Sequence, residues 1–112
     1  IGVIQGIPVC FDAKETAVDT FPLQNIHQHQ VDFMQEFERQ GGIAFFLIFY
    51  SHRDQFYYLT FRQLEKFWNR MEEGGRKSFR LDELEECYFF TGHNGLLVPY
   101  LDALQTDLNL RD

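Results

Sequence analysis

The amino-acid sequence predicts one α/β domain in which a central mixed β-sheet is flanked by helices. The hydrophobic pattern alternates between strand and helix periods in the order strand, strand, helix, strand, strand, helix, helix. Residues 43–50 are apolar on both faces, which predicts a central strand covered from two sides. A length of 112 residues is enough for one hydrophobic core and too short for two, so we expect residues 1–112 to form a single domain.

The first half of the chain predicts two strands and a helix. Residues 2–4 and 7–14 have the pattern of strands joined by a tight turn at Gly6, and Pro8 suits a strand entry or an edge. Residues 17–22 predict a connecting loop. Residues 25–40 predict a helix that begins at Asn25 and ends before Gly41. Its inner face is expected to carry Ile26, Gln30, Phe33, Met34 and Phe37.

The second half continues the alternation. Residues 56–60 predict a strand that forms a hairpin with residues 43–50. Residues 61–71 predict a helix, and residues 74–78 a polar, basic loop. The acidic segment 81–86 predicts a short exposed helix or an extended stretch. Residues 99–108 predict a last helix whose buried face carries Leu101, Leu104 and Leu108.

Composition and charge limit the classes of function. The net charge of -7 counts against nucleic-acid binding, although its distribution matters more than its sum and a nuclease site has acidic ligands of its own. Cys10 and Cys87 form no spaced framework, so we expect free thiols in a reducing cytoplasm and no structural zinc site. No apolar run approaches the roughly 20 residues that cross a bilayer. Because the chain opens at Ile1 inside a predicted strand, we expect an N-terminal truncation.

One short sequence pattern indicates a candidate catalytic site. Asp12 and Lys14 lie two residues apart on a predicted strand, so their side chains should project from the same face. A carboxylate can hold a hard cation such as Mg²⁺, which acidifies a bound water and neutralises charge that grows on a phosphate. A neighbouring lysine can orient that water. By itself the triplet is weak, because an exposed pair of opposite charges on a strand is common. The apolar strand around it and the polar helix start after it favour a site.

The helix that follows offers a second candidate. Gln30 falls on the apolar face, where a long polar side chain needs a partner, and it could either border a site or cap backbone groups. His27 and His29 cannot share one helix face, which excludes a two-histidine metal site with i, i+4 spacing. We expect them to face solvent or to contact DNA phosphate, with one of the two as an alternative border of the site, and His27 is a candidate DNA contact.

The basic loop is the third candidate. Arg76, Lys77 and Ser78 follow two glycines, so two cations and a hydroxyl could approach a phosphate backbone, and a solvated surface loop is the equally good alternative. The glycine spacing does not fit a phosphate-binding P-loop. No pattern supports a side-chain nucleophile or a dinucleotide site.

Several segments resemble, in the same order, the RecU family of Gram-positive Holliday junction resolvases, which is also labelled penicillin-binding-protein-related factor A. The matching runs are FDAKET (11–16), FPLQNIHQHQ (21–30), GGIAFF (41–46), FW (67–68), GRKS (75–78) and PYL (99–101). The family belongs to the restriction-endonuclease-like superfamily, whose motif is an Asp on one strand followed by (Asp/Glu)-x-Lys on the next. Asp12 and Lys14 resemble the second half, with Asp12 where many members carry Glu.

The resemblance implies a nuclease core domain that uses Mg²⁺ or Mn²⁺, with Asp12 as metal ligand, Lys14 as the group that positions water and Gln30 beside them. It also implies an Asp just upstream of Ile1, a basic N-terminal region, a cytoplasmic homodimer that cuts four-way junction DNA, and a link to a recombinase, with no membrane partner. Two alternatives stay open. One is a nuclease of the same fold that acts on other DNA, and the other is a non-catalytic DNA-binding or recombinase-regulating module.

Overall fold

The computed structural model describes residues 2–4, 6–91 and 97–111, which contain a five-stranded mixed sheet with the strand order β1-β2-β4-β5-β7. β2 and β4 are parallel, and the other neighbouring pairs are antiparallel. The architecture confirms the mixed sheet flanked by helices that the sequence predicts, and it is consistent with the restriction-endonuclease-like class that the family resemblance implies. The strands are β1 (Gly2–Ile4), β2 (Ile7–Thr16), β4 (Ile43–Tyr50), β5 (Gln55–Thr60) and β7 (Phe89–Phe90).

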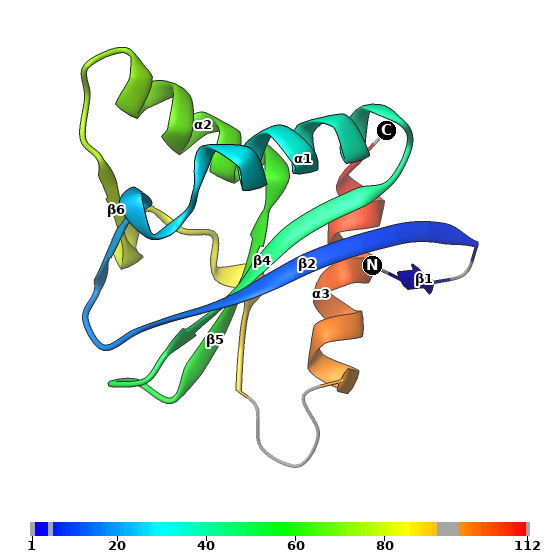
Figure 1. The fold of residues 1–112 in the computed structure, drawn as a ribbon. Helices are drawn as coiled ribbons and strands as arrows, with labels where there is room; N and C mark the ends of the chain where they lie inside the picture. The colour runs from blue at the N-terminus through cyan, green and yellow to red at the C-terminus, as the bar shows by residue number, and fades with distance from the viewer. Residues whose placement is uncertain (1, 5, 92–96, 112) are drawn as a thin grey trace.

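Three α-helices in the described ranges flank this sheet. The helices α1 (Gln28–Arg39) and α2 (Phe61–Glu72) lie together along one side of the sheet, and α3 (Leu97–Leu110) lies on the other side (Figure 1). A second, two-stranded sheet pairs β3 (Thr20–Pro22) with β6 (Ser78–Arg80). Three single-turn 3₁₀-helices complete the described chain: η1 (Leu23–Asn25), η2 (Leu81–Glu83) and η3 (Glu86–Tyr88).

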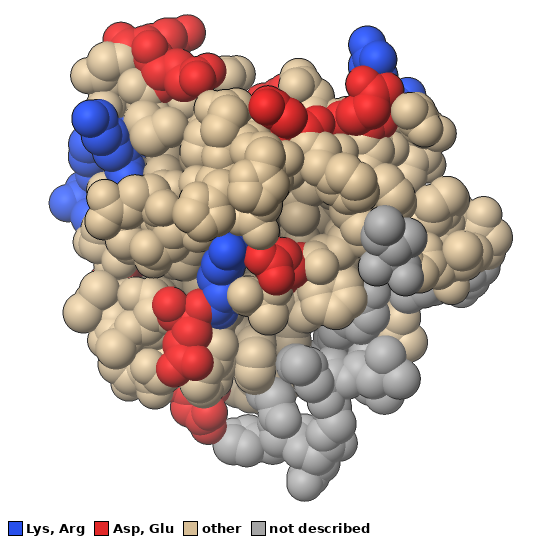
Figure 2. All heavy atoms as spheres, viewed as in Figure 1, with Lys and Arg blue, Asp and Glu red and all other residues tan. Residues whose placement is uncertain are grey.

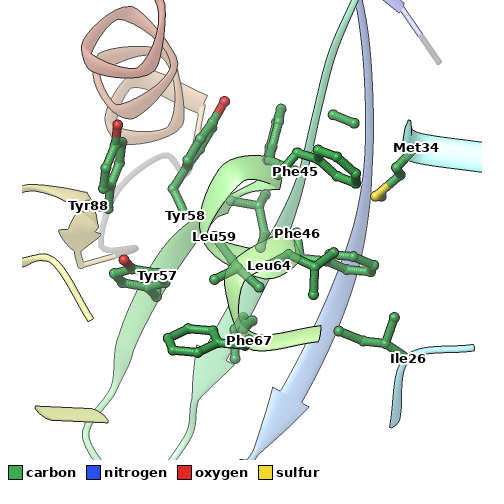
Figure 3. Close-up of a cluster of buried hydrophobic side chains, with 14 of the residues drawn as sticks. Ile26, Met34, Phe45, Phe46, Tyr57, Tyr58, Leu59, Leu64, Phe67 and Tyr88 are labelled. Atoms are coloured by element: carbon green, nitrogen blue, oxygen red, sulfur yellow. The ribbon is translucent and has the colours of Figure 1, made fainter. Parts of the chain in front are cut away.

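β4 forms the centre of the sheet and of the core, as its two-sided apolar sequence predicts. Phe45 and Phe46 are both fully buried although they point to opposite faces. Figure 3 shows Leu64 and Phe67 of α2 among the side chains on one face, and Tyr58 with its hydroxyl turned towards a helix on the other. That hydroxyl donates a hydrogen bond of 2.7 Å to Asp107 of α3. The two helical layers therefore pack on opposite faces of β4 and β5.

The hairpins follow the sequence prediction. β1 and β2 pair antiparallel through a turn in which Gly6 has φ +82°, a backbone conformation that suits glycine. β4 and β5 also pair antiparallel. α1 connects the parallel strands β2 and β4 as a crossover helix. The predicted helix 61–71 is confirmed as α2, and the predicted helix 99–108 lies within α3.

Three predictions for the segment before β4 are wrong. The first helix begins at Gln28 with His27 as its N-cap, because residues 23–25 form η1 and the N–H of Leu23 donates to the carbonyl of Lys77 at 2.9 Å. Residues 20–22 are a strand, β3, that pairs with β6 where the sequence predicted loops. Phe33, expected on the inner face of this helix, is 51% exposed.

None of the helices in the described ranges is both long enough and apolar enough to cross a membrane.

Candidate active site

The outer edge of β2 is where the predicted site residues meet. β4 pairs with β2 from Val9 to Thr16, whereas β1 reaches only as far as Val9 on the other side. Among the described strands, none covers the outer edge of β2 beyond that point. Asp12 and Lys14 lie on this stretch and share the face that α1 covers.

Asp12, Lys14 and Gln30 form one connected group. The Lys14 Nζ atom lies 3.2 Å from the Asp12 Oδ2 atom, as an ion pair. Gln30 donates from Nε2 to the same Oδ2 at 2.8 Å, and its Oε1 accepts from the Lys14 Nζ at 3.4 Å. The structure thus brings together the three residues that the sequence proposed as catalytic. Their roles in catalysis stay a prediction.

The strand and the helix place these side chains for simple reasons. The two-residue period of β2 sets Asp12 beside Lys14. Gln30 is the third residue of α1, so it projects from the first helical turn towards β2. Lys14 packs its stem inside the fold, with its side chain 18% exposed and its Nζ 5.9 Å from the centre of the Phe46 ring. The Asp12 side chain is 43% exposed, so the carboxylate is the open end of the group.

Electrostatics keep Asp12 ionised. Partial burial pushes the pKa of the Asp12 carboxyl up, but hydrogen bonds from Gln30 and Lys14, the charge of Lys14 and the N–H of Ala13 outweigh it. The pKa of Asp12 therefore lies below its ordinary value. The Ala13 N–H donates to Oδ1 at 3.0 Å, so both carboxylate oxygens have a partner. An ionised carboxylate with exposed oxygens is the donor that a hard cation requires.

A cleft of about 460 Å³ opens between β2 and α1, directly beside this group. Asp12 and Gln30 line it together with Cys10, Phe11, His29, Phe33 and Met34. The wall beyond Asp12 is apolar, and Phe33 is half exposed there. Burial raises the pKa of the Cys10 thiol, so it is a poor nucleophile at neutral pH.

The histidines border the group in different ways. His27 is exposed, and its backbone N–H donates to the Gln30 Oε1 at 3.2 Å. Its ring stacks on that of His29 at 5.6 Å between centroids. His29 lines the cleft, so it is the histidine of the two that borders the site, a choice that the sequence left open.

The basic segment is spread over two kinds of structure. Arg76 forms an ion pair with Glu83, with the Nη2 and Oε1 atoms 3.1 Å apart. Lys77 is exposed, and its carbonyl accepts the Leu23 N–H. Ser78 is the first residue of β6, and its carbonyl accepts from Arg70 at 2.8 Å. These residues lie next to the segment that leads into α1, and their contact with DNA stays a prediction.

A second hollow, of about 390 Å³, lies where α1, α2 and α3 meet. Its central cation, Arg111, is already paired with Glu38 and Asp107. This second hollow is therefore a weaker candidate for a ligand site than the cleft beside Asp12. In the part of the chain that the structure describes, no group of three or more His, Cys, Asp or Glu side chains could hold a metal ion. Asp12 is the carboxylate available at the cleft.

Comparison with known proteins identifies relatives. A family model for RecU, described as Recombination protein U, matches residues 1–106. The chain is similar to the Holliday junction resolvase RecU of Bacillus subtilis, at 49% identity over 89 residues that cover 79% of this chain and 42% of that protein. The RecU of Bacillus cereus strain G9842 is 45% identical over 113 residues, covering 94% and 54% respectively. That of Pediococcus pentosaceus is 41% identical over 105 residues, covering 92% and 52%. The chain spans about half the length of these curated relatives.

Proposed function

The chain belongs to the RecU family, and on that premise we propose that residues 1–112 form the single nuclease core domain of an endonuclease that resolves Holliday junctions in homologous recombination and DNA repair. The observation that carries the proposal is the contact between Asp12, Lys14 and Gln30, on the face of β2 that α1 covers. This contact occurs in a chain whose relatives are named Holliday junction resolvases.

The residues present fit a divalent cation. Mg²⁺ is bound in proteins through one or two carboxylates and keeps several waters, and Asp12 offers one ionised, partly exposed carboxylate. Mn²⁺ accepts the same oxygen ligands. When bound, the cation would acidify a water and neutralise charge on the phosphate.

The protein side chains have separate tasks in this proposal. Asp12 holds the cation. Lys14, whose ammonium lies 3.2 Å from the Asp12 carboxylate, orients the attacking water and stabilises negative charge on the phosphate. Gln30 holds the Asp12 carboxylate in place through its amide. Because the thiol of Cys10 is the candidate nucleophile in the cleft and its pKa is raised, we favour direct hydrolysis by water without a covalent intermediate.

The sheet register indicates where a second carboxylate would lie. Gly2 pairs with Val9, and each step back along β1 corresponds to one step forward along β2. If β1 continues in this register in a longer chain, the second position before Ile1 faces Asp12. Residues directly opposite each other on antiparallel strands point to the same face. An Asp at that position would complete the superfamily motif that the sequence resembles.

DNA binding has to be reconciled with a net charge of -7. Figure 2 shows that Lys and Arg side chains gather at the left of the face in view, beside the segment between α2 and β6, whereas Asp and Glu side chains lie along the upper edge and also lower on the same face. Arg76, Lys77 and Ser78 lie in or next to that segment. We propose that they and His27 contact the DNA backbone, because phosphate contacts need only local cations.

The partners follow from the proposed reaction. The substrate is four-way junction DNA, and paired cuts across such a junction require two active sites, so we propose a homodimer that works in the cytoplasm. A functional link to a recombinase is a further proposal. The net charge and the single carboxylate at the cleft favour the competing proposal of a non-catalytic DNA-binding or recombinase-regulating module. A nuclease of the same fold acting on other DNA is the third possibility.

Variants of the site separate these proposals. Asp12→Asn and Lys14→Ala should keep junction binding and lose Mg²⁺-dependent cleavage by roughly 10²-fold or more, because each removes a charge that acts on the reacting phosphate. Glu15→Gln is the matched control, since Glu15 is the exposed neighbour on β2 that points to the other face. Cleavage and gel-shift binding are measured on the same junction. The variants are made in the full-length protein, because the chain spans about half the length of its relatives. Cleavage retained in both site variants would contradict the nuclease proposal.

A further inference from the structure

The amide of Gln30 has three partners whose chemistry fixes its direction. Its Oε1 accepts from the backbone N–H of His27 at 3.2 Å and from the ammonium of Lys14 at 3.4 Å. Its Nε2 donates to the Asp12 carboxylate at 2.8 Å. An ammonium and a backbone N–H only donate, and an ionised carboxylate only accepts. Turned by 180°, the amide would set donor against donor and oxygen against oxygen.

The three partners differ in what else they do. In the proposed reaction Asp12 turns to a cation, and Lys14 turns to water or phosphate. The N–H of His27 belongs to the backbone and has no part in that chemistry. It is therefore the partner that can still hold the Gln30 carbonyl when the other two are engaged with substrate.

The start of α1 explains why this N–H is available. His27 is the N-cap residue with extended backbone angles, φ -86° and ψ 150°, so its N–H lies outside the hydrogen bonds of the helix. Gln30 is the third helical residue, which is where a Glu or Gln side chain reaches back to the N-cap N–H. The backbone N–H of Gln30 donates in turn to the carbonyl of His27 at 3.0 Å. The first helical turn and the site side chain are thus built as one unit.

We propose that the backbone N–H of His27 is a positioning group that locks the Gln30 amide with its NH₂ towards Asp12. This inference rests on the proposed nuclease function for its kinetic consequence, but the hydrogen bond itself can be tested without DNA or metal. It assigns to the backbone of His27 a role separate from any contact that its ring makes with DNA.

Proline substitution tests the N–H directly. His27→Pro removes the donor, and the proline Cδ atom would stand where the Gln30 carbonyl now approaches. The backbone angle at His27 is close to the range of proline, and Ile26 is extended, as a residue before proline requires. Gln28→Pro is the matched control. It places the same ring at the first helical position, where proline is favoured, and keeps the His27 N–H. His27→Ala removes the ring and keeps the N–H.

The first readout is nuclear magnetic resonance of the metal-free protein. The two Gln30 side-chain N–H protons should have separate shifts, with the one bonded to Asp12 shifted downfield and slow to exchange. Gln28→Pro and His27→Ala should keep this signature, and His27→Pro should lose it while circular dichroism still shows a folded protein. A signature that survives in His27→Pro would overturn the proposal, and so would its absence from the unmodified protein.

The second readout is the cleavage rate at saturating junction DNA and Mg²⁺. We expect kcat of His27→Pro to fall roughly two- to tenfold below that of His27→Ala, the range that one lost hydrogen bond allows, with KM equal in the two variants. Gln28→Pro should keep the rate of the unmodified chain. Equal kcat values for His27→Pro and His27→Ala would contradict the positioning role. The rates are measured in the full-length protein. If it cuts nothing, the nuclease proposal fails, and the resonance experiment still decides whether the N–H locks the amide.

Discussion

At the scale of single residues, the contacts of Asp12 orient the site more than they stabilise the fold. The Asp12 side chain is 43% exposed, so its ion pair with Lys14 is screened by water and contributes little to the free energy of unfolding. Gln30 joins both charged groups from a second element, α1. Changes at Gln30 should therefore affect the reaction more than the stability of the protein.

Gln30→Met tests this separation. Methionine keeps the length of the side chain and removes every hydrogen bond of the amide, so Asp12 and Lys14 lose their shared support. We expect the single-turnover cleavage rate to fall roughly 10- to 100-fold, as for other groups that orient metal ligands. The free energy of unfolding should change by less than about 1 kcal/mol, because water replaces the lost partners. Gln35→Met, at an exposed position of the same helix, is the control. Equal rates in the two variants would contradict the role of Gln30.

The sequence predicted this site in part. The two-residue period of a strand was enough to set Lys14 beside Asp12, and Gln30 stood out as a polar residue on an apolar helical face. The sequence left open which of His27 and His29 borders the site, and the structure has His29 in the lining of the cleft. The contact between the His27 N–H and Gln30 could not be predicted, because the sequence placed the helix start at Asn25 and the N-cap is His27.

At the scale of elements, ion pairs tie α2 to the segment that carries the basic residues. Glu83 of η2 accepts from Arg70 of α2 at 2.6 Å, lies 3.1 Å from Arg76, and accepts the backbone N–H of Arg80 at 2.9 Å. Its side chain is only 20% exposed. Glu83 thus holds together the end of α2, the loop after it and β6.

This arrangement predicts a pH dependence of stability. Hydrogen bonding to Arg70 is the main cause that lowers the pKa of Glu83, with the Arg80 N–H and the charge of Arg76 adding to it against burial. A lowered folded-state pKa gives stability that is present above the unfolded pKa of about 4.3 and is lost as the pH falls through the folded value. Urea denaturation should therefore show Glu83→Gln less stable than the unmodified protein at pH 6, with a smaller difference at pH 3. A difference that does not depend on pH would contradict this account.

Elements differed in how well the sequence predicted them. β4 and α2 were predicted almost to the residue, because a two-sided apolar run and a strong helical period are local signals. β3 and β6 were not predicted, because they are three-residue strands stabilised by pairing with each other across the chain. Thr20 pairs with Arg80 at one end and Pro22 with Ser78 at the other. The early start assigned to α1 has a related cause, since the bond from Leu23 to Lys77 fixes η1 from a distance.

At the scale of the whole molecule, one arginine joins the end of α3 to the end of α1. Arg111 donates to the Glu38 Oε2 at 2.9 Å and from its Nε to the Asp107 Oδ1 at 2.9 Å. Burial pushes the pKa of Arg111 down, but its bonds to Glu38 and Asp107 raise it above the ordinary value. Glu38 also accepts the backbone N–H of Ala44 at the start of β4. The two helical layers are thus tied together around the edge of the sheet.

Arg111→Met should be the most destabilising change to a charged side chain described so far. It leaves the buried Asp107 and the largely buried Glu38 without their cation. We expect a loss of about 3 kcal/mol, at the low end for a broken buried pair, because the Arg111 side chain is 33% exposed. Arg39→Met is the control, since Arg39 is 75% exposed in its pair with Glu36 and should cost less than about 1 kcal/mol. If Arg111→Met and Arg39→Met lost equal free energies of unfolding in urea denaturation, the role of Arg111 in joining α3 to α1 would be contradicted.

The central claim concerns the whole molecule acting on DNA, and it is tested most directly by one cleavage comparison. The full-length protein is incubated with Mg²⁺ and either a synthetic four-way junction or a linear duplex that contains the same arm sequences, and single-turnover rates are measured. The account predicts Mg²⁺-dependent cuts in the junction, at paired positions on opposite strands, and a much slower reaction on the duplex. Equal rates on both substrates would contradict junction resolution, and no cleavage of either would contradict the nuclease.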